Sequence, residues 1–375
     1  MNPIADELRL DFQFMARALE LAQQGLWTTS PNPRVGCVVV LNGKIIGEGW
    51  HQRTGEPHAE VHALRAAGNL AKGATAYVTL EPCSHTGRTP PCAEALIAAG
   101  LSKVVCAMED PNPLVSGKGL AMLNAAGIET VSGVLEDEAK ELNLGFVSRM
   151  TRGRPWVRLK SAGSLDGRTA LSNGISQWIT SPEARLDGHQ WRARACAILT
   201  GINTVLADDP QMNVRGLETE RQPDRIVLDS QLRTPTNARL FANTTGKTFV
   251  MTCTDDPTKQ SALETAGANV VHLPTNPNGQ IDLHALIEWC NRQQYNEIHV
   301  EAGAALNGAL LTAGLADELV QYLAPCLLGN TARGLFELPE YSTLEERIRL
   351  QLHDVRQIGP DIRTISRIIN KTQSL

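Results

Sequence analysis

The sequence has no long uninterrupted run of apolar residues, although 42% of its 375 residues are hydrophobic. A membrane-spanning helix needs about 20 consecutive apolar residues, so we expect no membrane partner. Basic clusters interleaved with aromatics are also missing, since aromatics make up only 4% of the chain and its net charge is −5. Because nucleic-acid-binding surfaces are ordinarily basic, we expect no nucleic-acid partner.

Cysteine is present but sparse. The eight cysteines are scattered along the chain and lack the density of a small disulfide-linked domain. The N-terminal segment is acidic and lacks the apolar core of a secretory signal. These features predict a protein of the reducing cytoplasm.

Two short motifs in the first half have the residue types of a catalytic zinc site. His58 and Glu60 form an H-x-E motif, and Cys83 and Cys92 each follow a proline. Catalytic zinc takes three protein ligands and leaves a fourth position for water. We therefore predict one zinc ion per chain, held by His58, Cys83 and Cys92, with Glu60 as the catalytic proton carrier. Zinc nucleobase deaminases have the same motif order, with two residues between the cysteines instead of eight.

Other interpretations of these residues remain open. A lone cysteine is often a small buried apolar residue. His58 and His62 are spaced as in H-E-x-x-H proteases, but no glutamate directly follows the first histidine. A closed structural site, with His85 as fourth ligand, would indicate an interaction module. Because zinc lowers the pKa of bound water and Glu60 could carry the proton to a leaving amine, we favour hydrolytic deamination of a nucleobase-like ring.

Alternating helical and strand patterns predict an α/β domain in the first half, with helices covering both faces of a sheet. An opening helix is expected from a cap at Asp11 to Gly25, with Phe12, Met15, Leu19 and Ala22 on its buried face. Asn42-Gly43 predicts a hairpin turn between two strands. Pro31-Asn32-Pro33 precedes the first strand, and Asn32 is either a turn residue or a substrate contact. Further helices are expected at 58–68, 92–100 and 117–126, and strands at 74–80, 103–108 and 128–131.

Arginines cluster with Gly153 and Pro155 in a segment whose composition suits a linker. We therefore expect two domains, 1–148 and 153–375. The second also has an α/β pattern and is expected to form one larger sheet, with a turn at 163–167 and a helix starting at Ser181-Pro182. Its other strands are expected at 156–160, 195–200, 225–229, 248–252, 269–273 and 297–301, and its other helices at 258–266 and 282–294.

Glycines suggest nucleotide contacts at two places. Gly117-Lys118-Gly119 has Met122 where a dinucleotide-binding motif needs its third glycine, so we set it aside. The small residues after Glu301 run from a strand into a helix, where backbone N–H groups could approach a pyrophosphate. Close helix–sheet packing is the alternative there.

The chain resembles the bifunctional riboflavin-biosynthesis deaminase/reductase family over essentially its whole length. The motifs that carry the resemblance are Pro31–Gly36, His58–Leu64, Glu81–Cys92, Lys160–Thr169, Ser176–Thr180, Ile198–Pro210 and Val300–Gly303. The family's cysteines are separated as Cys83 and Cys92 are, which accounts for the longer gap.

The resemblance implies a cytidine-deaminase-like three-layer α/β/α domain followed by a dihydrofolate-reductase-like α/β domain that uses NADPH. It implies deamination of 2,5-diamino-6-(5-phosphoribosylamino)pyrimidin-4-one, then reduction of the ribosyl group to ribityl. By similarity, NADPH contacts fall on Ala162, Trp178, Thr204, Asp208, Ser230, Gly303, Ala304, Ala305 and Leu306. By similarity, contacts to the phosphorylated substrate fall on Ser176, Arg192, Met212, Arg215 and Glu301.

Guanidinium groups pair bidentately with phosphate, so Arg192, Arg215 and Ser176 could form a phosphate clamp; ordinary surface arginines are the alternative. We also expect a homo-oligomer. The main alternative function is a nucleobase or tRNA deaminase with a non-catalytic C-terminal domain. The absence of the aromatic and basic surfaces typical of RNA binding speaks against it.

Overall fold

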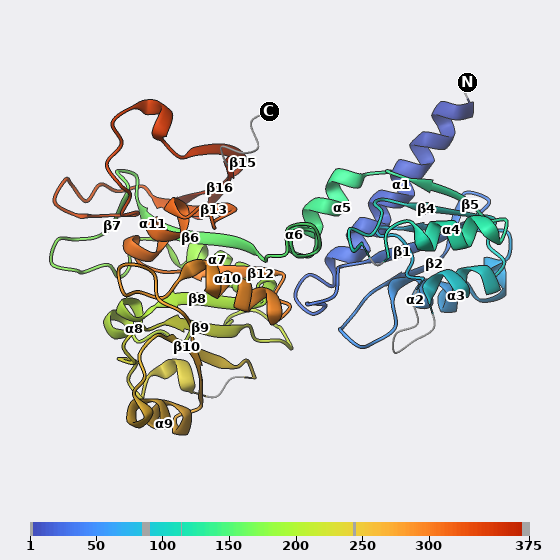
Figure 1. Ribbon diagram of the computed structural model, residues 1–375. Helices are drawn as coiled ribbons and strands as arrows, with labels where there is room; N and C mark the ends of the chain where they lie inside the picture. The colour runs from blue at the N-terminus through green and yellow to red at the C-terminus, as the bar shows by residue number, and fades with distance from the viewer. Residues whose placement is uncertain (1–2, 85–90, 114, 243–244, 370–375) are drawn as a thin grey trace. The chain divides into compact units, whose positions relative to one another are not determined.

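The structure is a computed structural model that describes residues 3–84, 91–113, 115–242 and 245–369. His85, the possible fourth zinc ligand, lies outside these ranges. The chain divides into two compact units, Met1–Gly153 and Arg154–Leu375, each with its own hydrophobic core (Figure 1). Within the described ranges, no helix is both long and apolar enough to cross a membrane.

The first unit is built on a five-stranded sheet of order β2-β1-β3-β4-β5. Strand β1 is antiparallel to β2 and β3, whereas β3, β4 and β5 are parallel. Helices α2, α3 and α4 follow one another on one face, and α1 contacts α5 on the other, as the prediction of three layers requires. The elements are α1 Pro3–Gln23, β1 Gly36–Leu41, β2 Lys44–Trp50, α2 Ala59–Ala67, β3 Thr75–Val78, α3 Cys92–Ala98, β4 Lys103–Cys106, α4 Lys118–Ala125, β5 Glu129–Ser132, α5 Glu136–Leu142 and α6 Leu144–Arg152.

The predicted hairpin between β1 and β2 is confirmed. Asn42 and Gly43 have φ values of 51° and 72°, as the two central residues of a type I′ turn require. Strand β1 also lies directly against α1, because a Cβ placed on Gly36 would be 1.9 Å from the carbonyl oxygen of Ala18. The turn and this close contact together determine the position of β1 in the first unit.

The opening helix differs from its prediction at the N-terminal end. It begins at Pro3, and Asp11 lies within it, where its buried carboxylate accepts a 2.6 Å hydrogen bond from the hydroxyl of Tyr77. Met15, Leu19 and Ala22 are buried as their spacing predicts, but Phe12 is 48% exposed. Asp11 takes the inward position in that turn because it is the partner of a buried tyrosine hydroxyl, which the sequence pattern does not reveal.

The arginine-rich segment near 150 is largely helical and is not an extended linker. Arg149 and Arg152 belong to the last turn of α6, which ends at Gly153 with φ 64°. Basic residues in the last turn favour a helix through its dipole, and a left-handed glycine commonly ends one. Arg154 already belongs to the second unit, where it forms a 2.5 Å ion pair with Asp317.

The second unit contains the single larger sheet that the sequence predicts. Its order is β11-β10-β9-β8-β12-β6-β13-β16-β15. In this order, every pair of neighbouring strands from β11 through β6 to β13 is parallel. Strand β16 is antiparallel to both β13 and β15. The elements are β6 Trp156–Ser164, β7 Arg168–Ala170, α7 Pro182–Arg194, β8 Ala197–Gly201, α8 Ile202–Asp208, β9 Asp224–Leu228, β10 Thr248–Thr252, α9 Pro257–Thr265, β11 Ala268–His272, α10 Leu283–Arg292, β12 Glu297–Glu301, α11 Ala304–Thr312, β13 Glu318–Ala324, β14 Arg333–Gly334, β15 Arg349–Ile358 and β16 Asp361–Ile369.

Two local predictions in this unit have opposite outcomes. The predicted start of α7 is confirmed, because the Ser181 side chain accepts a hydrogen bond from the backbone N–H of Ala184. The predicted turn at 163–167 begins too early, because Gly163 is still within β6 and pairs with Leu323. A glycine is needed there for close packing: a Cβ would lie 2.4 Å from the carbonyl oxygen of Arg168.

Candidate active sites

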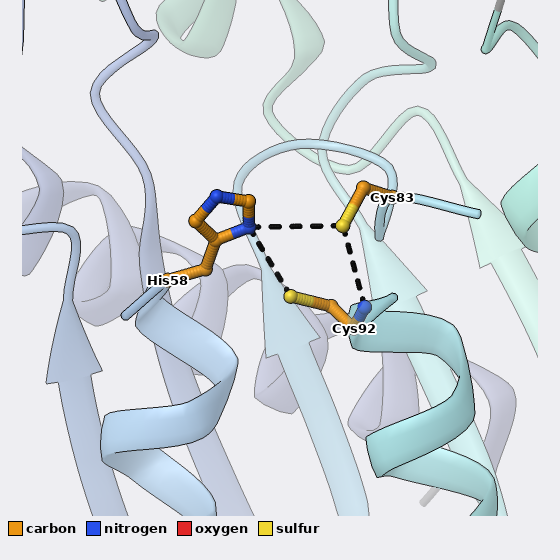
Figure 2. Close-up of side chains that lie close together, drawn as sticks. All are labelled: His58, Cys83 and Cys92. Atoms are coloured by element: carbon orange, nitrogen blue, oxygen red, sulfur yellow. Dashed lines mark hydrogen bonds between the residues drawn. The ribbon is translucent and has the colours of Figure 1, made fainter. Parts of the chain in front are cut away.

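The three predicted zinc ligands converge in the first unit. His58 lies directly before α2, Cys83 follows β3, and Cys92 is the first residue of α3. Figure 2 shows the His58 ring facing both sulfur atoms, with Nδ1 3.3 Å from the Cys92 sulfur and 3.7 Å from the Cys83 sulfur. The three donor atoms lie within 4.8 Å of one another. A nitrogen and two sulfurs at this spacing suit tetrahedral zinc with one open position.

The surroundings favour ionised sulfur at this site. The backbone N–H of Cys92, at the start of α3, donates to the Cys83 sulfur over 3.3 Å. Hydrogen bonds from the Cys92 thiol, the His58 ring and this amide lower the pKa of Cys83 to about 4, despite its partial burial. The pKa of the Cys92 thiol is raised because it donates to Cys83 and is buried. Zinc binds cysteine as the thiolate, so a bound ion would displace the protons that the two thiols carry.

Glu60 lies in the first turn of α2 and is 3% exposed. Burial raises the pKa of its carboxyl group above the ordinary value. Its Oε2 atom has no hydrogen-bond partner among the described residues, and a buried polar atom of this kind costs free energy. The unpartnered oxygen beside three ligand atoms fits a site for zinc with its reacting water.

The H-E-x-x-H interpretation does not match this arrangement. In the described part of the chain, His58, Cys83 and Cys92 form the one group of three or more potential ligands with metal-binding spacing, and His62 is not part of it. The buried thiol of Cys92 is thus explained by the site and not by simple core packing.

His51 is a site residue that sequence reasoning missed. Its ring lies 5.4 Å from the His58 ring, centroid to centroid, and its Nδ1 is 3.2 Å from the carbonyl oxygen of Pro57. The amide nitrogen of Asn32 lies 3.1 Å from its Nε2. Asn32 therefore contacts a residue beside the zinc ligands, which is compatible with its being either a turn residue or a substrate contact. A lone histidine after a strand carries no motif that could have indicated this position.

The second unit has a cavity of about 930 Å³ at the carboxyl ends of neighbouring parallel strands β9, β8 and β12. Ligands of open parallel sheets bind at this edge. The predicted residues that line the cavity are Ser176, Thr204, Asp208, Ser230, Gly303, Ala304, Ala305 and Leu306. Seven of these are predicted cofactor contacts, so the cavity is the candidate nicotinamide-nucleotide site.

The lining after β12 suits a pyrophosphate. A Cβ on Gly303 would meet no atom within 4 Å, so the glycine leaves open space in the cavity wall. Helix α11 begins directly after it, and no side chain caps its first N–H groups. Uncapped amides at a helix N-terminus bind phosphate well. These features of Gly303 to Leu306 fit the NADPH that the resemblance implies.

Two predicted cofactor residues are not part of the cavity lining. Ala162 lies in β6, where its carbonyl oxygen accepts a 3.2 Å hydrogen bond from Thr169. Trp178 is 69% exposed, and the Arg185 guanidinium lies over its ring at 4.5 Å. The structure thus brings most, but not all, of the predicted cofactor residues together.

The other four predicted substrate residues, Arg192, Met212, Arg215 and Glu301, are not part of the cavity lining. Arg192, on α7, donates to both carboxylate oxygens of Glu301, at the end of β12, over 2.5 and 2.7 Å. Its third nitrogen donates to the carbonyl oxygen of Asn213 over 2.9 Å. Arg215 donates to the Gln211 side chain over 3.2 Å, and Met212 is buried with φ 47°.

Lys160 is a second residue that spacing alone did not single out. It pairs with Glu301 across strands β6 and β12. Burial and, after it, the nearby Arg192 guanidinium lower the pKa of its ammonium group, against the attraction of Glu301. A partly buried lysine with a lowered pKa beside a predicted substrate contact is a functional-site candidate.

The two sites define an enzyme with a zinc-binding deaminase domain joined to an α/β reductase domain. The first half matches the cytidine and deoxycytidylate deaminase zinc-binding region over residues 8–108, and the second matches the RibD C-terminal domain over residues 155–364. The chain belongs to the RibD family of riboflavin biosynthesis proteins.

Relatives cover nearly the full chain. The riboflavin biosynthesis protein RibD of Escherichia coli K12 is 51% identical over 364 residues, 94% of this chain and 98% of that protein. The structure of Acinetobacter baumannii RibD is 46% identical, with a TM-score of 0.89, and covers 97% of this chain and 100% of its own. A Thermotoga maritima diaminohydroxyphosphoribosylaminopyrimidine deaminase/5-amino-6-(5-phosphoribosylamino)uracil reductase is 33% identical with a TM-score of 0.85, at the same coverage.

These matches confirm the predicted fold class and the bifunctional riboflavin-biosynthesis enzyme over the single-function deaminase. They also confirm zinc as a cofactor of the first domain. NADPH is the cofactor that a RibD reductase domain implies.

Proposed function

We propose that the first unit deaminates 2,5-diamino-6-(5-phosphoribosylamino)pyrimidin-4-one by hydrolysis. The observation that carries this proposal is the convergence of His58, Cys83 and Cys92 beside the buried, unpartnered carboxylate oxygen of Glu60. The name of the Thermotoga relative, a diaminohydroxyphosphoribosylaminopyrimidine deaminase, supports the choice of substrate. Bound zinc would supply a water molecule of lowered pKa.

Glu60 is the proton carrier of this reaction. It accepts the proton of the attacking water and delivers it to the amine, which leaves as ammonia. Its burial raises the pKa of the carboxyl group, and this helps it to hold the proton between the two steps. His58, Cys83 and Cys92 would hold the metal, and both thiols would lose their protons when it binds.

The second unit reduces the ribosyl group of the deaminated product to ribityl with NADPH as hydride donor. Thr204, Asp208, Ser230 and Gly303 to Leu306 hold the cofactor, with Ala162 and Trp178 as further contacts. Ser176, Arg192, Met212, Arg215 and Glu301 bind the substrate. The cavity at the carboxyl ends of β8, β9 and β12 supports this assignment, because seven of the nine proposed cofactor residues line it.

The test supplies purified enzyme with the diaminopyrimidinone phosphate and follows ammonia and NADPH absorbance separately. Ammonia release is expected without NADPH, and loss of NADPH absorbance is expected with already deaminated substrate. Ammonia release that requires NADPH, or reduction only of the amino form, would contradict this order of reactions.

We also propose a homo-oligomer of the cytoplasm, with β15 of the second unit in the interface. Strand β15 pairs with β16 and is an edge strand of the sheet among the described residues. A bulge between Leu352 and Asp354 shifts the register by one residue, so Val355 shares a face with Leu350 and Leu352. These three side chains are 43 to 61% exposed, and an apolar edge strand readily pairs with another copy. Leu352→Lys should shift the mass measured by light scattering to that of the monomer.

A further inference from the structure

A buried carboxylate lies two residues before the zinc ligand Cys83. Glu81 is 3% exposed, and its two oxygens accept backbone N–H groups from a distant segment. One oxygen accepts from Asp110 at 3.1 Å and Gly117 at 2.9 Å, and the other from Gly119 at 2.8 Å and Leu120 at 3.4 Å. The last three donors form the N-terminus of α4.

Helix α4 also lies directly against the backbone next to Glu81. A Cβ on Gly119 would lie 2.0 Å from the carbonyl oxygen of Pro82, the residue between Glu81 and Cys83. The glycine is therefore needed for the contact and not for a nucleotide. Gly117-Lys118-Gly119, which looked like part of a dinucleotide motif, instead binds an anion of the protein itself. A carboxylate at a helix N-terminus is stabilised by the unsatisfied N–H groups and the helix dipole.

The segment that carries Cys83 is thereby held from both ends. The N–H of Glu81 donates to the carbonyl oxygen of Met108 over 3.0 Å, and the carbonyl oxygen of Cys83 accepts from Ala93 of α3 over 3.2 Å. Between these two anchors, the carboxylate of Glu81 is the only side-chain link to α4 in the described hydrogen bonds. Removing it would free the Pro82-Cys83 backbone to move relative to His58 and Cys92.

We propose that Glu81 is a positioning residue of the zinc site, which acts on Cys83 through the N-terminus of α4. This inference rests on the proposed zinc site. Outer groups that hold metal ligands commonly change metal affinity by about 10- to 100-fold when they are removed. Glu81 makes no contact with the metal or the reacting atoms, and it sets how firmly the sulfur of Cys83 is held.

The test compares Glu81→Gln with the unchanged full-length protein. Glutamine keeps the shape but replaces one acceptor oxygen by an NH₂ group, which faces N–H donors and cannot accept from them. Zinc release to excess chelator, followed with a zinc-sensitive dye well below the unfolding temperature, should become about 10- to 100-fold faster. In cobalt-substituted protein, the thiolate-to-metal absorption should also shift, because the geometry at the Cys83 sulfur changes.

Asn143→Ala is the matched control. Asn143 is fully buried in the same unit and bonds to the backbone N–H and carbonyl of Arg34, without contact to Glu81. It should lower the unfolding temperature and leave zinc release unchanged. Gly119→Ala tests the same contact from the other side and should speed zinc release as Glu81→Gln does.

The outcomes distinguish the positioning role of Glu81 from the zinc site itself. Zinc release from Glu81→Gln at the unchanged rate, or equal acceleration in Asn143→Ala, would overturn the positioning role while the zinc site stands. Absence of zinc from the unchanged protein would overturn the proposed site itself.

Discussion

Arg192 and Glu301 form a bidentate ion pair in the second unit, with Nε to Oε1 at 2.5 Å and Nη2 to Oε2 at 2.7 Å. The two residues are 109 positions apart and come from α7 and the end of β12. The guanidinium that the sequence offered as a free phosphate ligand is therefore partly neutralised by a carboxylate. Its first role is to keep Glu301 ionised, and it lowers the pKa of that carboxyl group well below 4.5 in spite of burial.

This pair predicts a pH-dependent stability difference between the unchanged protein and Arg192→Met. At pH 7 the variant should be less stable by about 1–3 kcal/mol, because the partly buried Glu301 carboxylate is left without its main partner. Lys160 and His299 also face Glu301, but the pKa of each is lowered by burial, so they compensate only in part.

The direction of this pH dependence follows from the pKa of Glu301 in the folded unchanged protein and in the folded variant. A lowered pKa contributes stability that is fully present above the ordinary value of 4.5 and is lost as the pH falls through the folded value. In the variant the pKa of Glu301 rises, so Glu301 becomes neutral at higher pH and the penalty disappears. Urea unfolding at pH 7, 5 and 4 should therefore show a shrinking difference, and a constant one would contradict this account.

We predict that Arg215→Ala weakens substrate binding far more than NADPH binding. Arg215 is exposed, and the described hydrogen bonds of its guanidinium go to the neutral side chains of Gln211 and Asn213. Its charge is thus more available to a phosphate than that of Arg192. Separate titrations with cofactor and substrate measure the two effects. A larger loss for NADPH would assign this arginine to the nucleotide.

Cys83→Ser should lose zinc, because a serine hydroxyl does not supply the thiolate that the site provides. Elemental analysis of the purified variant gives the metal content per chain. Cys106→Ser is a suitable control, since Cys106 is a buried cysteine of β4 outside the ligand group. Full zinc content in Cys83→Ser would refute the ligand assignment.

Glu60→Gln should keep zinc and fold but release ammonia about 10²- to 10⁴-fold more slowly, because an amide cannot carry the water proton. Zinc content and unfolding temperature serve as controls for structure. Reduction of deaminated substrate by the same variant should be unchanged. Near-normal deamination would mean that another group carries the proton.

The two halves should be separable catalysts. We predict that a chain ending near Ser148 binds zinc and deaminates, and that one beginning near Gly153 reduces deaminated substrate with NADPH. All zinc-site residues precede position 93, all proposed reductase residues follow 159, and each unit has its own core. Weak activity in each fragment is sufficient support. Failure of full-length Glu60→Gln to reduce deaminated substrate would show that the sites share machinery.

Much of the parallel α/β framework was predictable from sequence because its signals are local. The turn at Asn42-Gly43 and the cap at Ser181 depend on residues within a few positions of each other. The C-terminal strands β13, β15 and β16 gave no such signal. Strand β15 alternates polar and apolar residues only from Arg349 to Leu352, because the bulge before Asp354 interrupts the pattern, and this run is too short to predict a strand.

The sequence by itself determined the chemistry at the zinc site, because short motifs specify the ligand types and their spacing along the chain. Only the tertiary structure decided which distant groups serve them. Glu81 on the N-terminus of α4 and Arg192 on Glu301 arise from segments brought together by sheet order, whereas His51 is placed beside His58 by the loop between β2 and α2. A buried charge or polar group must find a partner to offset desolvation, and that partner is selected by proximity in the folded chain and not by distance along it.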